Sequence, residues 1–149
     1  MSMIQIALRW LHIVPAVVAG GAVIYGFLAL QPALGELPEA DAKRLRESLA
    51  RRWRGVFSVC TTMLLGSGLL NFMMFQAPMH RGQPLYHALF GVKFLCAMTV
   101  FFLGAALTGR TAALAPIRAN ARFWVGVSAA LVIAIVLISG ILRGIPPGS

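Results

Sequence analysis

Hydrophobic residues occur in four long runs along the chain, separated by short segments that hold charged residues, proline or glycine. The runs cover residues 8–34, 56–75, 86–107 and 123–142. Each is long enough for an α-helix to cross the hydrocarbon core of a bilayer, which takes about 20 apolar residues. Charges and helix-breaking residues at the ends of the runs are typical of helix termini. The pattern predicts one all-α domain over residues 1–149, an integral membrane protein in which four transmembrane helices form a bundle.

The segment between the first two runs has a helical pattern of its own. Leu45, Leu49 and Trp53 recur every four residues between charged positions, which predicts an amphipathic helix over residues 37–54. Such a helix either continues the second transmembrane helix beyond the membrane or lies along the lipid surface. We expect its charged face to be in water. This part of the chain holds all the acidic residues, which are Glu36, Glu39, Asp41 and Glu47.

Basic residues are distributed unevenly among the segments outside the runs. Six lie between the first and second runs and three between the third and fourth, whereas the other side carries only Arg9, Arg81 and Arg143. By the positive-inside rule, the first and third connections face the cytoplasm and both termini face outward. A tryptophan near three of the predicted boundaries agrees with an interfacial aromatic belt. We therefore expect a multi-pass protein of a bacterial inner membrane, with both termini on the periplasmic side.

The composition indicates that lipid is the solvent for much of the surface. Hydrophobic residues make up 59% of the chain and charged residues 11%, whereas a soluble domain carries about 25% charged residues. The formal net charge of +9 comes from basic residues in short loops, where contact with anionic lipid is favoured over nucleic acid. The expected partner is the bilayer and not a nucleic acid. Cys60 and Cys96 lie inside apolar runs without a CxxC pattern, which favours two small apolar side chains over a disulfide.

Ionisable side chains at membrane depth are energetically costly, so each one is a candidate functional residue. His12 precedes Pro15 in the first run and begins a helical face of small residues that leaves room for a flat macrocycle. The alternative is an interfacial histidine bonded to a backbone carbonyl that Pro15 leaves free. His87 begins the third run, at a depth similar to that of His12. The two histidines are either the axial ligands of one haem iron or unrelated interfacial residues.

Lys93 is the third candidate, roughly 9 Å deeper than His87 and on a different face of the same predicted helix. A lysine at this depth is expected to face the interior of the bundle, because contact with lipid tails is unfavourable. No acidic residue lies in any of the four runs. An anionic ligand, such as a haem propionate, or direct coordination by the neutral amine is therefore favoured over a structural ion pair. Polar residues of the second run, Ser67 among them, are expected to form hydrogen bonds between helices.

A second metal chemistry is indicated near the end of the second run. Thioether and imidazole ligands suit Cu(I), since soft sulfur selects soft metals, and four such side chains are close together in the sequence. Methionine is equally common as an apolar side chain in lipid-facing helices, so this pattern is an alternative to haem. The candidate copper ligands are Met73, Met74, Met79 and His80.

Three stretches resemble the small membrane families grouped around copper-resistance protein D. They read RWLHIVPAVVAGGAVIYGFLALQPAL, RRWRGVFSVCTTMLLGSGLLN and LYHALFGVKFLCAMTVFFLGAALTGR, and they cover the first three predicted helices. A more distant resemblance is to the HemJ-type protoporphyrinogen oxidases, which share the Leu-His-Ile opening and a lysine within the third helix. That resemblance implies b-type haem bound through His12, with Lys93 as a second functional residue. The chain lacks the basic and histidine residues that this family has late in the first helix, and the histidine usual near Lys93. The oxidase activity itself is therefore not expected.

The function expected from these observations is b-type haem binding in the membrane, for electron transfer or within a redox complex. If the protein is an enzyme, it is a membrane oxidoreductase. The haem ligands would be His12 with His87 or Lys93. The alternatives are a copper-binding or copper-transporting protein and a non-catalytic structural subunit of a membrane complex. Other membrane redox subunits or further copies of the chain are the expected protein partners.

Overall fold

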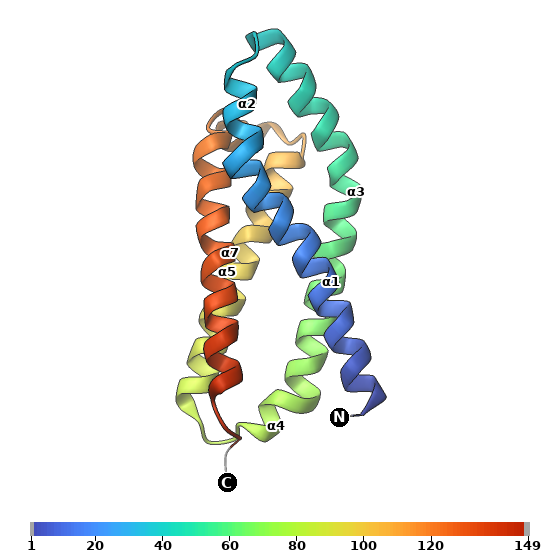
Figure 1. Ribbon diagram of the computed structural model, residues 1–149, viewed down its shortest axis with the longest axis vertical. Coiled ribbons are helices and arrows are strands. Elements are labelled where there is room, and N and C mark those ends of the chain that lie inside the picture. The colour runs from blue at the N-terminus through green and yellow to red at the C-terminus, as the bar shows by residue number, and fades with distance from the viewer. Residues whose placement is uncertain (1, 148–149) are drawn as a thin grey trace.

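The computed structural model describes residues 2–147, which form helices and turns without any strand. Four long helical rods run side by side (Figure 1). The first rod is α1 (Met3–Tyr25), η1 (Gly26–Leu30) and α2 (Gln31–Gly35), and the second is α3 (Glu39–Asn71), η2 (Phe72–Gln76) and α4 (Ala77–Met79). The third is α5 (Pro84–Thr108). Short η3 (Ala112–Leu114) and α6 (Ala115–Ala119) lead to the fourth, α7 (Ala121–Gly144).

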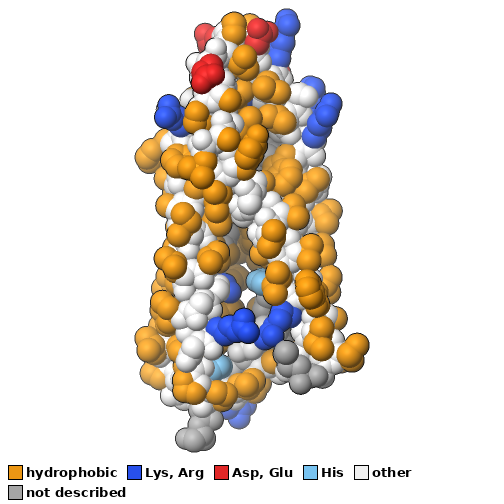
Figure 2. Space-filling model, in the orientation of Figure 1, with side chains coloured by type: hydrophobic (Ala, Val, Ile, Leu, Met, Phe, Trp, Pro, Cys, Tyr) orange, Lys and Arg blue, Asp and Glu red, His pale blue; other side chains and the backbone are white. Residues whose placement is uncertain are grey.

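All four rods are long and apolar enough to cross a membrane, as the hydrophobic runs predict. Only 11–17% of the residues in the most apolar part of each rod are buried inside the bundle. Large side chains such as Val17, Leu95 and Leu137 are 68%, 67% and 63% exposed. Hydrophobic side chains cover the flanks of the molecule, and charged side chains gather toward its ends (Figure 2). This surface is stable only where hydrocarbon replaces water around it, so the chain has the architecture of a multi-pass membrane protein.

The amphipathic segment belongs to the second rod. Residues 39–54 are part of α3, which continues without a break into the apolar run and ends at Asn71. The second rod has 41 residues, or roughly 60 Å at 1.5 Å per residue, which is about twice the thickness of a hydrocarbon core. The segment therefore extends the rod out of the membrane and does not lie along its surface. We call this end of the molecule, with the turns at 36–38 and 109–120, the basic end. The opposite end, with the turn at 80–83 and the first and last described residues, is the terminal end (Figure 1).

Two π-helical segments occur late in the first and second rods, each ending two residues before a proline. In η1 the N–H of Gln31 bonds to the carbonyl of Gly26, and Pro32 follows. In η2 the N–H of Ala77 bonds to the carbonyl of Phe72, and Pro78 follows. Proline has no N–H, and its ring collides with the carbonyl four residues earlier. The wider π turn moves that carbonyl away, which allows each rod to continue through its proline.

The rods pack as two pairs, α1 with α3 and α5 with α7. Toward the basic end the pairs are joined by glycines against aromatic rings. A Cβ on Gly104 of α5 would collide with the ring of Phe57 of α3, and one on Gly126 of α7 would lie 2.9 Å from the ring of Phe27. Small residues let helices approach closely in lipid, where no hydrophobic force drives their association. Toward the terminal end the pairs diverge (Figure 1).

Two arginines at the basic end hold the C-terminus of α5. The Arg54 guanidinium donates to the Thr108 carbonyl from Nε at 3.1 Å and from Nη2 at 2.8 Å. Arg118 donates to the carbonyls of Ala106 and Thr111 at 3.3 and 2.7 Å. The last carbonyls of a helix have no partner within the helix, and cations near them are favourable. Some of the basic residues at this end of the molecule therefore cap a helix.

Candidate functional site

A cavity of about 580 Å³ lies between the two helix pairs. Residues from α1, α3, α5 and α7 all line it, together with residues of the turn at the terminal end. The divergence of the pairs leaves this space, because the glycine contacts that hold them together lie toward the basic end. Figure 2 shows a hollow in this face of the molecule, in which basic and histidine side chains gather. Its volume is in the range of small-molecule and cofactor sites.

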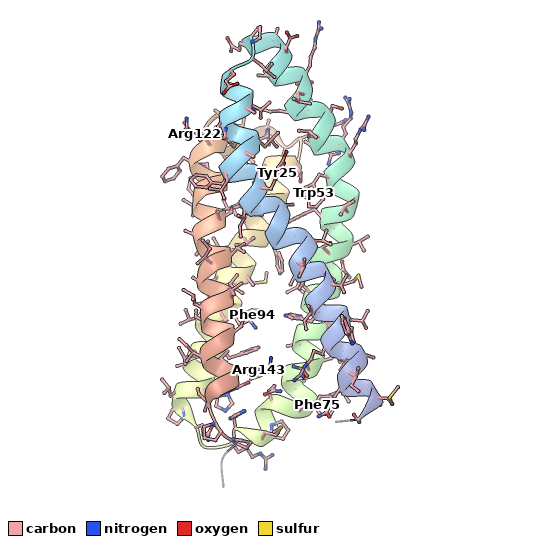
Figure 3. All side chains as sticks on the ribbon, viewed as in Figure 1. Tyr25, Trp53, Phe75, Phe94, Arg122 and Arg143 are labelled. Atoms are coloured by element: carbon pink, nitrogen blue, oxygen red, sulfur yellow. The ribbon has the colours of Figure 1, made fainter. Side chains whose placement is uncertain are left out.

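The walls of the cavity are mostly apolar, and the lysine and arginine side chains that line it are basic. Ala16, Ala19 and Val23 of α1 line it beyond His12, as expected for a face of small residues. Lys93 of α5, Arg9 of α1 and Arg143 of α7 also line it, and Figure 3 shows Arg143 near the terminal end of α7. Among the described lining residues there is no carboxylate. The acidic residues are all at the basic end (Figure 2). The cavity therefore favours a ligand that is largely apolar and carries negative charge.

His12 is held against α3 by a glycine and a serine. Its Nδ1 lies 3.1 Å from Oγ of Ser67, a side chain that is 5% exposed. A Cβ on the adjacent Gly68 would be 2.9 Å from Cε1 of His12, 3.3 Å from Nδ1 and 4.0 Å from Nε2. Only glycine at this position lets the ring lie so close to the α3 backbone. The ring therefore presents its Nδ1 and Cε1 side to α3, and its Nε2 is the nitrogen farther from that helix.

The hydrogen bonds of Ser67 determine which nitrogen of His12 carries the proton. The Ser67 hydroxyl donates its only hydrogen to the Met63 carbonyl, at 2.5 Å. Its oxygen is then an acceptor toward His12, so Nδ1 of His12 is the N–H donor in this bond. A neutral imidazole has one protonated nitrogen, which leaves Nε2 with a free lone pair. Histidines that bind metals have this arrangement, because the hydrogen bond of one nitrogen orients the other toward the metal.

This tautomer can be tested without any ligand. In ¹⁵N NMR spectra of the detergent-solubilised protein, neutral His12 is expected to be protonated mainly at Nδ1. Ser67→Ala removes a hydrogen bond of about 1 kcal/mol and is expected to shift the tautomer ratio about fivefold toward Nε2–H. Ser128→Ala is the matched control, because Ser128 is also buried and bonds to a carbonyl of its own helix, that of Trp124 at 2.9 Å. An unchanged ratio in Ser67→Ala would contradict the assignment.

Lys93 lies at the same depth as His12, on the other helix pair. His12 is nine residues beyond the start of α1 at Met3, and Lys93 is nine residues beyond the start of α5 at Pro84. Both helices begin at the terminal end, so each side chain is roughly 14 Å along its helix. Both line the same cavity. Of the residues proposed from the sequence to hold a cofactor, these two are the ones that the structure brings together.

His87 lies outside the cavity. It is exposed, only three residues into α5, and its Nε2 is 3.1 Å from the carbonyl oxygen of His80. Its ring also packs edge-on against Phe72 and Tyr86. His87 was expected at a depth similar to that of His12. It is only three residues beyond the start of α5, whereas His12 is nine residues beyond the start of α1, so His87 lies nearer the terminal end. The structure thus does not bring His87 and His12 to one site.

His80 is part of a hydrogen-bonded cluster that closes the terminal end. Its Nδ1 is 2.6 Å from Oε1 of Gln83, whose Nε2 donates to the Pro146 carbonyl at 3.1 Å. The His80 ring stacks on Tyr86 at 3.7 Å, and the Tyr86 hydroxyl donates to Oε1 of Gln76 at 3.0 Å. These contacts tie the turn at 80–83 to the C-terminal segment. His80 is 4% exposed, and its environment is that of a structural residue in a tight turn.

The four candidate copper ligands are divided between two surfaces. Met79 and His80 line the cavity, whereas Met73 and Met74 do not, and the latter two are 62% and 52% exposed on η2. No group of three or more histidine, cysteine, aspartate or glutamate side chains suited to a metal ion occurs within residues 2–147. Proximity in the sequence did not produce a cluster because consecutive helical residues point about 100° apart.

Sequence reasoning did not identify three features of this site: Arg9, Arg143 and the hydrogen bond that His12 donates to Ser67. Arg9 precedes His12 by three residues, a spacing that places both on one helix face, so this signal was present in the sequence. Arg143 comes from the opposite end of the chain and had no comparable signal. Ser67 was expected to bond between helices, but its partner was not predictable.

Comparisons of the chain with protein-family models, curated proteins and solved structures find no match.

Proposed function

We propose that this protein binds b-type haem in the central cavity, where Nε2 of His12 would hold the iron, and that it transfers electrons within the membrane. The observation that supports this most directly is the anchored ring of His12. Its Nδ1 is held by Ser67, and its Nε2 keeps a lone pair at a cavity wall. A hydrogen bond to the nitrogen that does not bind the metal orients a histidine ligand and raises its basicity.

The charges and shape of the cavity also suit haem. Haem b is a flat, mainly apolar macrocycle with two carboxylates, and the cavity combines apolar walls with the cations Arg9 and Arg143. A lysine at membrane depth without a carboxylate nearby is costly as a cation, and Lys93 would avoid that cost by coordinating the iron as the neutral amine. We assign the propionates to the two arginines, which are exposed at the terminal end of α1 and α7.

Lys93 decides what the bound haem can do. When bound, haem supplies one-electron redox chemistry, and six-coordinate iron transfers electrons without binding a further ligand. Lys93 lies at the depth of His12 on the opposite helix pair and lines the same cavity, which supports it as the second residue that would hold the iron. We therefore propose His12 and Lys93 as the pair, in place of His12 and His87.

The charge asymmetry supports a particular orientation in the membrane. We propose a bacterial inner membrane, with the basic end in the cytoplasm and both termini on the periplasmic side. Haem near the periplasmic surface would exchange electrons with another membrane redox subunit or a second copy of the chain. The copper hypothesis loses support because Met73 and Met74 lie outside the cavity. No observation favours the role of a structural subunit over that of a haem protein.

The test is a dithionite-reduced minus oxidised absorption spectrum of the protein purified in mild detergent from cells supplied with haem precursor. The expected result is the sharp bands of a six-coordinate, low-spin b-type haem at about one haem per chain. A high-spin spectrum would contradict Lys93 as the second ligand while retaining His12. Folded protein without haem bands, and unable to take up added haem, would overturn the proposal. Copper analysis of that same sample would then test the alternative.

A further inference from the structure

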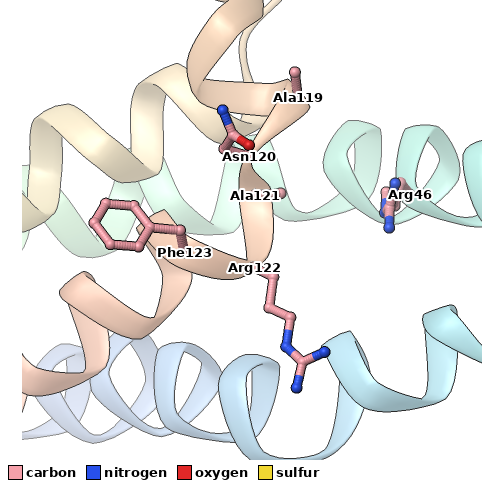
Figure 4. Close-up of a pocket in the computed structure, with 6 residues that line it drawn as sticks. All are labelled: Arg46, Ala119, Asn120, Ala121, Arg122 and Phe123. Atoms are coloured by element: carbon pink, nitrogen blue, oxygen red, sulfur yellow. The ribbon is translucent and has the colours of Figure 1, made fainter.

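A second cavity, of about 410 Å³, lies at the basic end, far from the haem site proposed above. It lies between the extension of α3 and the junction of α6 and α7 (Figure 4). The residues that line it are Arg46, Ala119, Asn120, Ala121, Arg122 and Phe123. Two guanidinium groups from segments far apart in the sequence thus border one space.

The cations of this cavity lack acidic neighbours, although every acidic residue of the chain is in the same part of the molecule. No carboxylate is among the described residues that line it. Acidic side chains three or four positions from Arg46 would be able to neutralise it along α3, but Ala42, Lys43, Leu49 and Ala50 occupy those positions. Arg54 and Arg118 donate to the end of α5, whereas Arg46 and Arg122 are exposed at the cavity. These two arginines are therefore free to bind an external anion.

The level of the cavity along α7 indicates where that anion comes from. The apolar run of α7 begins at Phe123, directly beside the cavity, and Trp124 follows. Tryptophan at the end of a transmembrane helix marks the level of the lipid headgroups. Phe123 is 63% exposed, so it offers an apolar surface next to the two cations. Cations beside an apolar flank at this level match a lipid, with its phosphate and acyl chains, better than a free ion.

We propose that Arg46, Asn120 and Arg122 bind the phosphate-containing headgroup of an anionic phospholipid from the leaflet at the basic end. Guanidinium groups bind phosphate oxygens through paired N–H donors, and the Asn120 amide supplies a further donor. Basic pockets between transmembrane helices are known sites for such headgroups. The bound lipid would bridge α3 and α7, which belong to different helix pairs, and so hold the two pairs together at this end.

The experiment is native mass spectrometry of the full-length protein titrated with phosphatidylglycerol or phosphatidylcholine. We expect one saturable phosphatidylglycerol site, with binding about thirtyfold weaker in the double variant Arg46→Gln/Arg122→Gln, from a loss of about 1 kcal/mol for each guanidinium contact with the phosphate. The control Arg51→Gln/Arg52→Gln removes the same charge from exposed positions of α3 outside the cavity, where salt screens it, and is expected to change binding less than about threefold.

Three results would overturn the proposal. Equal losses in the two double variants would show a general electrostatic attraction and not a site. Equal binding of phosphatidylcholine would exclude recognition of an anionic headgroup. Complete displacement of the lipid by millimolar inorganic phosphate would identify the cavity as a site for the free anion. None of these results depends on haem, so the outcome is separate from that of the proposed function.

Discussion

Replacing His12 by alanine is expected to abolish haem binding, with a loss of affinity on the order of a hundredfold or more. Removing only the hydrogen-bond partner of a metal ligand typically costs 10- to 100-fold, and loss of the ligand itself costs at least as much. The haem content of purified His12→Ala, measured against protein concentration, should therefore fall close to zero. His12 is only partly buried and lines the cavity, so its truncation enlarges an existing space and the bundle should remain folded.

The matched control for this variant is His87→Ala. His87 is also a histidine in the terminal half of the molecule, but it bonds to the His80 carbonyl and does not line the cavity. This variant is expected to retain its full complement of haem. Added imidazole should restore haem to His12→Ala, because the alanine leaves space for it beside Ser67. Full haem content in His12→Ala, or loss in His87→Ala alone, would contradict the assignment of the ligand.

Replacing Gly104 by leucine is expected to destabilise the bundle by about 1–3 kcal/mol, the usual cost of overpacking. The ring of Phe57 occupies the space that a Cβ at this position would need, and it is a buried residue that cannot move into solvent. This contact joins the two helix pairs, so the variant should also loosen the cavity. The measurement is the unfolding midpoint in a mixed-micelle titration with sodium dodecyl sulfate.

Gly91→Leu is the control because Gly91 is on the same helix and a Cβ added there would meet nothing within 4 Å. Leucine has a higher helix propensity than glycine, which stabilises both variants by roughly 1 kcal/mol, so this contribution cancels when their unfolding midpoints are compared. Gly91→Leu is expected to unfold at the wild-type midpoint or above it, and Gly104→Leu well below it. Equal midpoints would mean that the close approach of α5 and α3 does not hold the helix pairs together.

The glycines illustrate why packing was only partly predictable. Small residues in the apolar runs indicate close helix contacts in general, and the structure has such contacts at Gly20, Gly68 and Gly104. Gly66 and Gly91 look equivalent in the sequence but meet no neighbour. Which glycines are in contact depends on the crossing points of the rods, and these follow from the three-dimensional arrangement of all four.

The candidate site was predictable where a rule about lipid applied. Lys93 was expected to face the interior because charged groups avoid hydrocarbon, and it lines the cavity. His12 was expected either to border a macrocycle or to be an interfacial residue, and it lines the same cavity. The avoidance of hydrocarbon does not constrain side chains near the ends of the helices, because there they reach water on any face. His80 and His87 are in that zone, and their contacts come from the turn at 80–83, in which Gly82 has a φ of +75°.

The sequence by itself determined the four membrane-spanning helices and the separation of charge between the two ends of the molecule. The helices follow from hydropathy, because a bilayer imposes the same length and apolarity on every helix that crosses it. The separation of charge follows from the positions of the basic and acidic residues between the apolar runs. Only the tertiary structure decided which residues share a site. Ser67 orients the His12 ring, and the second cavity is bordered by Arg46 and Arg122. The basic and histidine residues that share the central cavity are His12, Lys93, Arg9 and Arg143. Each of these groupings joins residues from different helices, and their contacts depend on how the helices pack.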